Sequence, residues 1–292
     1  MKSRKKHNWI STLAFVLVFL AGLSLMLYPT VSNYWNEKLQ SQVIVEYDNS
    51  MNAIDPETYE IKMTEARIFN ASLATRSNPY LLTPEQREVY PKMLQLSENS
   101  APMAYIEIPS IGVNLPIYHG TDENTLKTAV GHMEWTSLPI GGESTHCVIS
   151  GHRGLPSAEL MTNIDQMEKG DVFYIHVLGD TLKYRVDKIS VVLPDDMKDV
   201  LISESKDYVT LVTCTPYGIN SHRLLVRGER VPDTASAIEA ADIPGEVEFI
   251  EPVYVAIALL AVGGILTVLV LAFSGGRKKK ESVNEKIEEK TE

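Results

Sequence analysis

The chain has 292 residues and a formal net charge of −11 at pH 7. This acidic balance argues against nucleic acid as a partner, because nucleic-acid binding needs basic patches on the protein. There are only two cysteines, Cys147 and Cys214, and neither forms a metal-ligand spacing with the seven histidines. No Gly-rich phosphate loop occurs in a strand–helix context either. We therefore expect no metal and no organic cofactor.

Two uncharged apolar stretches frame the chain. Residues 9–28 and residues 253–273 each have the length of a helix that crosses a bilayer. Basic residues precede the first stretch, in residues 1–8, and follow the second, and such residues mark the cytoplasmic side of a span. The pattern predicts a two-pass protein of the cell membrane, with both termini (1–8 and 274–292) cytoplasmic and residues 29–252 extracellular. The alternative for the first stretch is a cleavable signal peptide, although no Ala-x-Ala-like site follows it.

Residues 29–100 have the pattern of a helical region. Asp55-Pro56-Glu57 is typical of a helix start, with aspartate as the N-cap and proline at the first helical position. Thr83-Pro84-Glu85-Gln86 has the spacing of a capping box. Between these two starts, residues 76–82 lack a helical period and contain Asn78-Pro79-Tyr80, so we expect a loop there.

Residues 101–232 have the texture of a β domain. Short runs rich in Val, Ile, Tyr and Leu alternate with turn residues such as Gly179-Asp180, which suits a tight hairpin. Only residues 123–128 and 158–168 look helical within this part. The pattern predicts a mainly β fold, either an antiparallel barrel or a sandwich. Residues 233–252 are acidic and poor in aromatics, and we expect them to tether the β domain to the second apolar stretch.

Cys214 is a candidate nucleophile, because it ends a strand-like run and precedes a loop with Pro and Gly. A cysteine in this place lies at a rim that a substrate can reach, although a free cysteine is more often a small buried hydrophobe. His152 stands at a similar strand end and can shuttle the proton that a thiol loses. Arg223 begins the run that returns after the Cys214 loop, and its cation can stabilise a thiolate or an oxyanion. The alternatives are a structural histidine and an ordinary surface arginine.

Cys147 is expected in the core. Successive side chains of a strand point to opposite faces, which places Cys147 with Ile149 and opposite His152. The alternation therefore predicts a buried structural thiol. The alternative is a disulfide between Cys147 and Cys214, which would suit a non-catalytic, membrane-tethered adhesion module.

Three separated segments resemble the sortase family. Thr210-Leu211-Val212-Thr213-Cys214 is similar to the Thr-Leu-x-Thr-Cys signature of sortases, and Arg223 stands where their essential arginine follows. His152, in Ser-Gly-His-Arg-Gly, resembles their catalytic histidine. The stretches that resemble class C sortases, the pilin polymerases, are residues 115–121, 131–142 and 210–228. The resemblance is strong over residues 100–232 and looser over the helical region and the two-span layout.

The resemblance implies an eight-stranded sortase-type β-barrel in residues 101–232, with no metal or organic cofactor in the reaction. It also implies cleavage of a Leu-Pro-x-Thr-Gly-like sorting signal between Thr and Gly. In that reaction Cys214 attacks the Thr carbonyl and forms a thioester, His152 protonates the departing amine, and Arg223 steadies the oxyanion. The acyl group then passes to a lysine side chain of a pilin, in pilus assembly. Thr213, next to the nucleophile, is a further candidate substrate contact.

A lid is the point at which this chain departs from the resemblance. Class C sortases commonly cover the cleft with a lid that contains an Asp-Pro-aromatic motif. Asn78-Pro79-Tyr80 is similar to that motif, but an asparagine offers no charge to Arg223. We therefore expect a lid in residues 76–82 that is held loosely. The alternative is an ordinary interhelical turn.

Two other activities remain open at this point. A housekeeping sortase would anchor surface proteins to cell-wall peptide instead of polymerising pilin, and a hydrolytic cysteine protease would transfer the acyl group to water. The second apolar stretch and the helical residues 29–100 favour the pilin polymerase over the housekeeping enzyme.

Overall fold

The structure is a computed structural model that describes residues 3–95, 102–231 and 263. The chain divides into two compact units, and the second of them, Ser32–Glu239, contains the β domain. The apolar first part of helix α1, up to Val31, belongs to the other unit.

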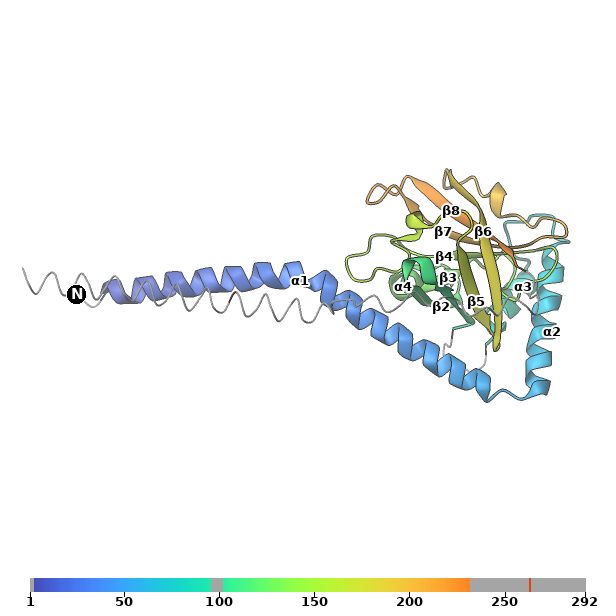
Figure 1. Cartoon of the computed structure of the whole chain (residues 1–292), viewed down its shortest axis with the longest axis horizontal. Coiled ribbons are helices and arrows are strands. Elements are labelled where there is room, and N and C mark those ends of the chain that lie inside the picture. The colour runs from blue at the N-terminus through green and yellow to red at the C-terminus, as the bar shows by residue number, and fades with distance from the viewer. Residues whose placement is uncertain (1–2, 96–101, 232–262, 264–292) are drawn as a thin grey trace, which may run out of the picture. The chain divides into compact units, whose positions relative to one another are not determined.

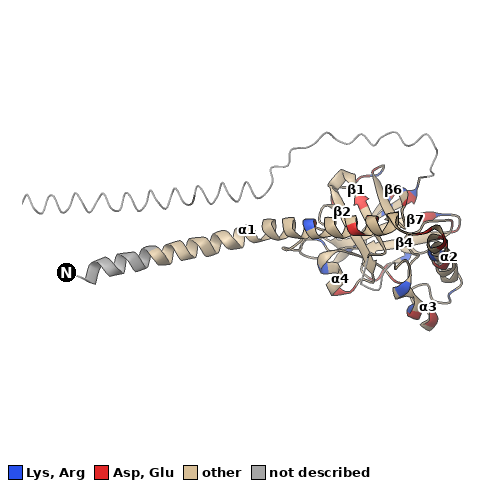
Figure 2. Ribbon diagram, turned by 90° about the horizontal axis from the view of Figure 1, so that it is seen from below, with Lys and Arg blue, Asp and Glu red and all other residues tan. Residues whose placement is uncertain are grey.

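Helix α1 (Ser3–Asn52) contains the first predicted span. Residues 13–36 hold no charged side chain, and this part of α1 is the uncharged stretch of ribbon in Figure 2. Within Leu13–Asn52, α1 is long and apolar enough to cross a membrane. The second predicted span, residues 253–273, lies outside the described residues, apart from Gly263, as do the predicted tether and the C-terminal tail.

The helical region that follows α1 begins its helices where the sequence predicts. Helix α2 (Pro56–Leu73) is capped by Asp55, whose carboxylate accepts a hydrogen bond from the Thr58 amide at 2.9 Å. Helix α3 (Pro84–Val89) has the predicted capping box between Thr83 and Gln86, and the short 3-10 helix η1 (Tyr90–Lys92) follows it directly. Each cap satisfies backbone amides that a helix start leaves without partners.

Eight strands form a closed barrel in the order β1-β2-β3-β4-β7-β8-β6-β5 (Figure 1). They are β1 (Ala104–Ile108), β2 (Val113–His119), β3 (Val130–His132), β4 (Thr145–Ser150), β5 (Val172–Val177), β6 (Asp180–Val192), β7 (Asp207–Thr215) and β8 (His222–Arg230). The predicted eight-stranded barrel is confirmed, but it is not purely antiparallel. Strand pairs β2–β3 and β4–β7 are parallel, and the second of these pairs places the candidate site.

Four short helical elements interrupt the barrel. They are η2 (Pro109–Ile111), α4 (Glu123–Thr128), η3 (Ile164–Gln166) and η4 (Lys198–Val200). The predicted helix at 123–128 is confirmed, whereas the one at 158–168 is wrong beyond η3. Leu160 has a left-handed backbone (φ 44°), which a right-handed helix cannot contain. Asn33 and Asn36 of α1 bind this loop instead, through the Glu159 amide at 2.7 Å and the Ser157 carbonyl at 2.6 Å.

One apolar core joins the barrel to the helices of the same unit. Its buried members include Tyr47 of α1, Phe69 of α2 and Ile106 of β1. Polar contacts reinforce the packing, since Asn70 exchanges two hydrogen bonds with the backbone of Leu138, at 2.7 and 3.3 Å. Burial in a shared core contributes stability in proportion to the apolar area removed from water, so the helices from Ser32 onward are a structural part of the barrel unit.

Candidate active site

Parallel pairing of β4 and β7 brings two candidate residues to one edge of the barrel. The pairing runs from Thr145 opposite Asp207 to Ser150 opposite Val212. His152 and Cys214 each stand two positions beyond that last pair, one on each strand. Because parallel strands run in the same direction, both residues emerge at the same end of the sheet.

The third candidate joins them from the other neighbour of β7. Cys214 is the direct cross-strand partner of Arg223 in the antiparallel pair β7–β8. Directly opposed residues of such a pair point to the same face of the sheet. The Arg223 guanidinium donates to the backbone carbonyls of Asn220 and His222, at 3.3 and 3.1 Å. The structure therefore brings the three predicted catalytic residues to one rim, and each of them is partly exposed.

Thr213 lies on the opposite face from Cys214. Its side chain is 2% exposed, and its hydroxyl donates to the Gly151 carbonyl at 2.8 Å. The Gly151 amide in turn donates to the Val212 carbonyl at 3.1 Å. These two contacts continue the β4–β7 connection up to the residue before His152, so Thr213 holds the two strand ends together and has no exposed surface to offer a substrate.

Cys147 is a buried free thiol, as the strand alternation predicts. It is 3% exposed and belongs to the main core, and both cysteines are free. Burial raises the pKa of the Cys147 thiol well above its ordinary value, so this sulfur stays protonated. The alternative of a disulfide between Cys147 and Cys214 is contradicted, and the adhesion module loses its structural basis.

A small apolar cluster lies next to Cys214 on the outer face of the sheet. Val212 and Leu225 stand two positions from Cys214 and Arg223 on the same strand faces, and both are buried in a cluster separate from the main core. The cluster consists of Val148, Val200, Val212 and Leu225, with Met133, Trp135, Val192 and Met197 packed at its edge. Sequence reasoning missed this cluster, although the alternation along β7 and β8 contains the signal for two of its members.

His146 fixes the segment that contributes Val200 to this apolar cluster. Its Nδ1 lies 2.9 Å from the Leu201 carbonyl and its Nε2 lies 2.7 Å from the Thr210 hydroxyl. A carbonyl only accepts, so Nδ1 carries the proton and Nε2 accepts from Thr210. Burial lowers the pKa of His146 to about 4, which keeps the ring neutral at pH 7. His146 is thus a tether for the β6–β7 connection, residues 193–206.

The predicted lid loop is anchored by a residue that sequence reasoning missed. The Tyr80 ring lies 5.4 Å from the Trp135 ring in an edge-on contact. Arg76 donates to the Trp135 carbonyl at 2.8 Å and to the Leu81 carbonyl at 3.1 Å. The Asn78 side chain accepts from the Tyr80 amide at 2.9 Å, which is a local turn. The loop is therefore bound to Trp135 at the edge of the apolar cluster, and Arg76 makes the hydrogen bond that joins them.

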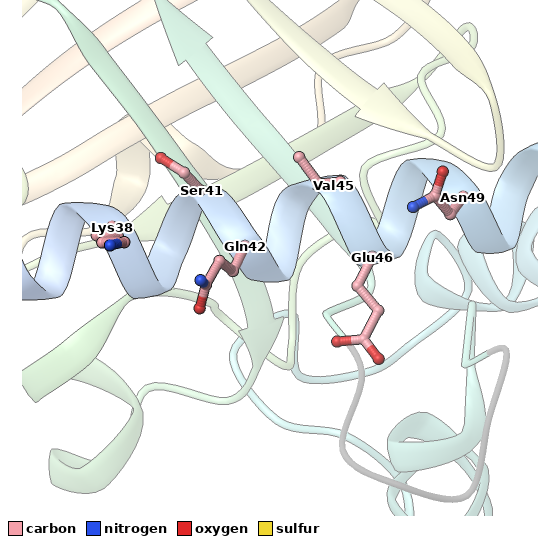
Figure 3. A pocket seen from close by; sticks show the side chains of 6 residues that line it. All are labelled: Lys38, Ser41, Gln42, Val45, Glu46 and Asn49. Atoms are coloured by element: carbon pink, nitrogen blue, oxygen red, sulfur yellow. The ribbon is translucent and has the colours of Figure 1, made fainter.

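A hollow on helix α1 lies apart from these residues. Six side chains of α1 line it: Lys38, Ser41, Gln42, Val45, Glu46 and Asn49 (Figure 3). Because all of them come from one helix, the hollow is an open furrow and not an enclosed pocket. Within residues 3–95 and 102–231, no three His, Cys, Asp or Glu side chains are placed to hold a metal ion.

Comparison with known proteins agrees with this architecture. Residues 106–231 match the family model of the sortase domain. The crystal structure of sortase C1 from Streptococcus agalactiae is 44% identical, with a TM-score of 0.63, and covers 66% of this chain and 100% of its own. Sortase C from Streptococcus pneumoniae is 48% identical, with a TM-score of 0.59 and coverages of 65% and 97%. Sortase A from Bacillus anthracis is 25% identical over 223 residues, 76% of this chain and 95% of that protein.

Fold and relatives together define a cysteine transpeptidase built on a closed β-barrel. The chain belongs to the sortase family, and its structural relatives are class C sortases.

Proposed function

We propose that this sortase cleaves a Leu-Pro-x-Thr-Gly-like sorting signal between Thr and Gly and transfers the acyl group to a lysine of a pilin. The observation that supports it most is the convergence of three strands on one rim. His152 and Cys214 each lie two positions beyond the last residues that pair in β4–β7, and Arg223 is the cross-strand partner of Cys214 in β7–β8. A nucleophile, a proton carrier and a permanent cation are what acyl transfer through a thioester needs.

In the first half of the reaction, the Cys214 thiolate attacks the carbonyl carbon of the signal's Thr. The oxyanion that forms accepts hydrogen bonds from Arg223, whose fork has five N–H donors. The C–N bond to Gly then breaks, and His152 gives its proton to the departing amine. The product is a thioester on Cys214. Of the apolar cluster next to Cys214, only the edge residues Met133, Trp135, Val192 and Met197 are partly exposed, and they suit the Leu and Pro that precede the reacting Thr.

In the second half, a lysine amine attacks the thioester carbon. His152 takes the proton that the amine loses, and the Cys214 thiolate leaves, so the enzyme returns to its starting state. The product is an isopeptide bond. Thr213 does not contact the substrate in either half. Its hydroxyl donates to the Gly151 carbonyl, so its role is to hold the strand ends that carry His152 and Cys214.

A pilin lysine as the acceptor is supported by the higher sequence identity to class C sortases than to the Sortase A relative. The structures that are 44% and 48% identical are class C sortases, and the Streptococcus pneumoniae structure is described in terms of pilin substrate specificity. The Sortase A relative from Bacillus anthracis is 25% identical. Anchoring of surface proteins to cell-wall peptide is the second candidate, and it differs only in the amine that resolves the thioester.

We further propose a two-pass protein of the cell membrane with an extracellular catalytic domain. Helix α1 supplies one span. The uncharged residues 253–273 support a second span. Basic residues lie before the first apolar stretch and after the second, which supports a cytoplasmic location of both termini. Membrane-bound precursors that present the sorting signal are then the partners.

Intact-mass measurement on the full chain in detergent tests the nucleophile. The chain is incubated with a Leu-Pro-x-Thr-Gly peptide, beside Cys214→Ala and the matched control Cys147→Ala. We expect an adduct equal to the peptide cut after Thr in the wild type and in Cys147→Ala, and none in Cys214→Ala. An adduct that survives Cys214→Ala would overturn the assignment, as would its absence from both the wild type and the lid variant Tyr80→Ala.

The acceptor is tested by adding competing amines to the preformed thioester. A pilin-derived lysine peptide and a cell-wall peptide amine are offered at equal concentration, and the products are separated by mass. We expect the lysine product to dominate. Dominance of the cell-wall product would indicate the housekeeping reaction, and release of free acid alone would indicate a hydrolytic cysteine protease.

A further inference from the structure

Arg153, the residue after His152, contacts the segment that follows Cys214. Its guanidinium lies 5.9 Å from the centre of the Tyr217 ring, and its Nη1 lies 3.5 Å from the Thr215 hydroxyl. On its other side Nη2 forms an ion pair with Asp165. The Arg153 side chain is only 10% exposed, so the guanidinium is enclosed between the His152 segment and the β7–β8 connection.

Gly154 extends the same contact. Its backbone is left-handed (φ 78°), and a Cβ added to it would lie 2.7 Å from a carbon of the Tyr217 ring. The ring therefore packs directly on the Gly154 backbone, where only glycine fits. The Gly154 amide donates to the Thr162 hydroxyl at 3.1 Å, which fixes the loop from behind. Two successive residues after His152 thus contact Tyr217.

These contacts lie where the sheet no longer holds the two segments together. Regular β4–β7 pairing ends at Ser150 and Val212, and the last ties before the catalytic residues are those of Gly151. His152 comes next in the chain, and the contacts with Tyr217 follow on its far side. The residues on both sides of His152 are therefore tied to the Cys214 segment, Gly151 to the strand before Cys214 and Arg153 and Gly154 to the loop after it, while the His152 carbonyl itself accepts from the Met161 amide at 3.3 Å.

The burial of Arg153 costs more free energy than its ion pair with Asp165 returns. Its Nε is buried and makes no hydrogen bond within the described part of the chain. A buried donor without a partner costs free energy, whereas a partly exposed ion pair such as that with Asp165, which is 43% exposed, contributes little. A costly feature next to a catalytic residue calls for a role beyond stability.

We propose that Arg153 is a positioning residue for acyl transfer, which holds His152 in register with Cys214 by joining the histidine loop to Tyr217. The proposal rests on the proposed roles of Cys214 and His152. Arg153 touches neither the substrate nor the reacting atoms. It limits the movement of His152 relative to the Cys214 sulfur. A displacement of about 1 Å between catalytic groups lowers the rate by about 100-fold.

The chain contains a matched control for this test. Arg227 on β8 forms two hydrogen bonds to the Asp187 carboxylate, and its guanidinium lies 4.1 Å from the centre of the Tyr208 ring. It reproduces the combination of carboxylate and tyrosine contacts, but it does not adjoin His152. Arg227→Gln therefore measures what the loss of such a cluster does to stability alone.

The experiment compares kcat and KM of Arg153→Gln and Arg227→Gln for peptide cleavage, with the full chain in detergent. For Arg153→Gln we expect kcat to fall about 10- to 100-fold with KM within about twofold. Arg227→Gln should lower Tm by about as much as Arg153→Gln does, but its kcat should stay near the wild-type value.

Tyr217 provides a second route to the same test, and it is 60% exposed, so its replacement leaves the core intact. Tyr217→Ala should lower kcat, whereas Tyr217→Phe, which keeps the ring on Gly154, should restore it. Arg153→Gln should add little in the Tyr217→Ala background, because the two residues form one contact. Arg153→Lys should remain impaired, since an ammonium does not reproduce a planar guanidinium over a ring.

Two outcomes would overturn the proposal while leaving the proposed function intact. One is a wild-type kcat in Arg153→Gln or in Tyr217→Ala. The other is a loss in KM alone, which would mean that Arg153 acts on substrate binding and not on His152. Failure of the wild-type chain to form a thioester on Cys214 is a different result, because it would refute the proposed function itself.

Discussion

Cys214 and Arg223 are directly opposed on neighbouring antiparallel strands, β7 and β8. Side chains in such a pair have Cβ atoms about 4.5–5.5 Å apart. The sheet register therefore sets the two residues opposite each other on one face of the sheet. Two contacts of the Arg223 guanidinium go to the Asn220 and His222 carbonyls, and both use Nη1, which leaves the donors of Nη2 and Nε for a substrate oxygen.

Replacement of Arg223 is expected to affect the chemical step. Arg223→Gln should lower kcat about 100- to 1,000-fold, as does removal of an oxyanion donor in other acyl-transfer enzymes. Arg223→Lys should recover only part of the loss, because a point charge cannot supply a planar fork of donors. The measurement is kcat and KM for peptide cleavage, with the exposed Arg185→Gln on β6 as control. A change confined to KM would show that Arg223 only binds substrate.

We expect residues 76–82, the predicted lid, to uncover Cys214 when their Arg76 anchor is removed. Arg76→Met loses the hydrogen bonds to the Trp135 and Leu81 carbonyls. We expect a bulky, charged thiol reagent to alkylate Cys214 several-fold faster in this variant, and peptide cleavage to rise with it. Arg87→Met, an exposed arginine of α3, is the control. Equal alkylation rates in the wild type and Arg76→Met would mean that residues 76–82 do not restrict access to Cys214.

A substitution at Asn78 should have the opposite effect and hold residues 76–82 more tightly over Cys214. Asn78→Asp keeps the local turn to the Tyr80 amide, since a carboxylate accepts the same hydrogen bond. It also adds the charge that could pair with Arg223. We therefore expect slower alkylation of Cys214 than in the wild type, and high salt should remove the difference. Unchanged alkylation at low salt would show that the lid's hold does not depend on a charge at this position.

The local features of the fold were predictable because their signals lie in a few adjacent residues. Asp55 and the Thr83–Gln86 pair cap their helices as predicted. The tight hairpin was predicted one residue late, because the register pairs Val177 with Asp180 and leaves Leu178–Gly179 as the turn. Strand β3 was missed, since Val130–His132 is too short to form an apolar run.

Non-local features could not be predicted in the same way. The rim position of Cys214 follows from its place at a strand end, but its partnership with Arg223 depends on the β7–β8 register. The contacts of Arg76 with Trp135 and of His146 with Leu201 join residues 59 and 55 positions apart. No periodicity or capping rule reaches over such separations, because tertiary packing decides which segments meet.

Tyr90 connects the helical region to the barrel through a buried hydroxyl. The hydroxyl lies 2.9 Å from His132 Nδ1 and accepts from the Gly120 amide at 3.0 Å. His132 Nε2 lies 2.8 Å from the Ser137 carbonyl, so Nε2 carries the proton and Nδ1 accepts from Tyr90. Tyr90→Phe leaves the buried His132 Nδ1 and the partly buried Gly120 amide without the Tyr90 hydroxyl, and it should reduce the free energy of unfolding by about 1–3 kcal/mol. Urea denaturation checks this, with Tyr217→Phe as control, and equal midpoints for the two variants would contradict it.

Stability should fall as the pH drops from about 6.5 toward 4. Burial lowers the pKa of both His132 and His146 to about 4, while a histidine in the unfolded chain titrates near 6.5. Between these values the unfolded state binds more protons than the folded state, so the free energy of unfolding decreases with decreasing pH. Each histidine should account for about 2 kcal/mol between pH 7 and pH 5. Asp207 opposes this at lower pH, because burial raises the pKa of its carboxyl.

His146→Gln isolates one of these two contributions. The variant lacks the titrating ring, so the difference in its free energy of unfolding between about pH 7 and pH 5 should be smaller than that of the wild type by about 2 kcal/mol. Cys147→Ala, on the same strand and equally buried, should lose stability at both pH values and keep the wild-type dependence, because burial keeps the Cys147 thiol protonated throughout this range. Urea unfolding of the three proteins at both pH values measures these differences in the free energy of unfolding. Parallel wild-type and His146→Gln curves would show that His146 is not held neutral by its contacts with Leu201 and Thr210.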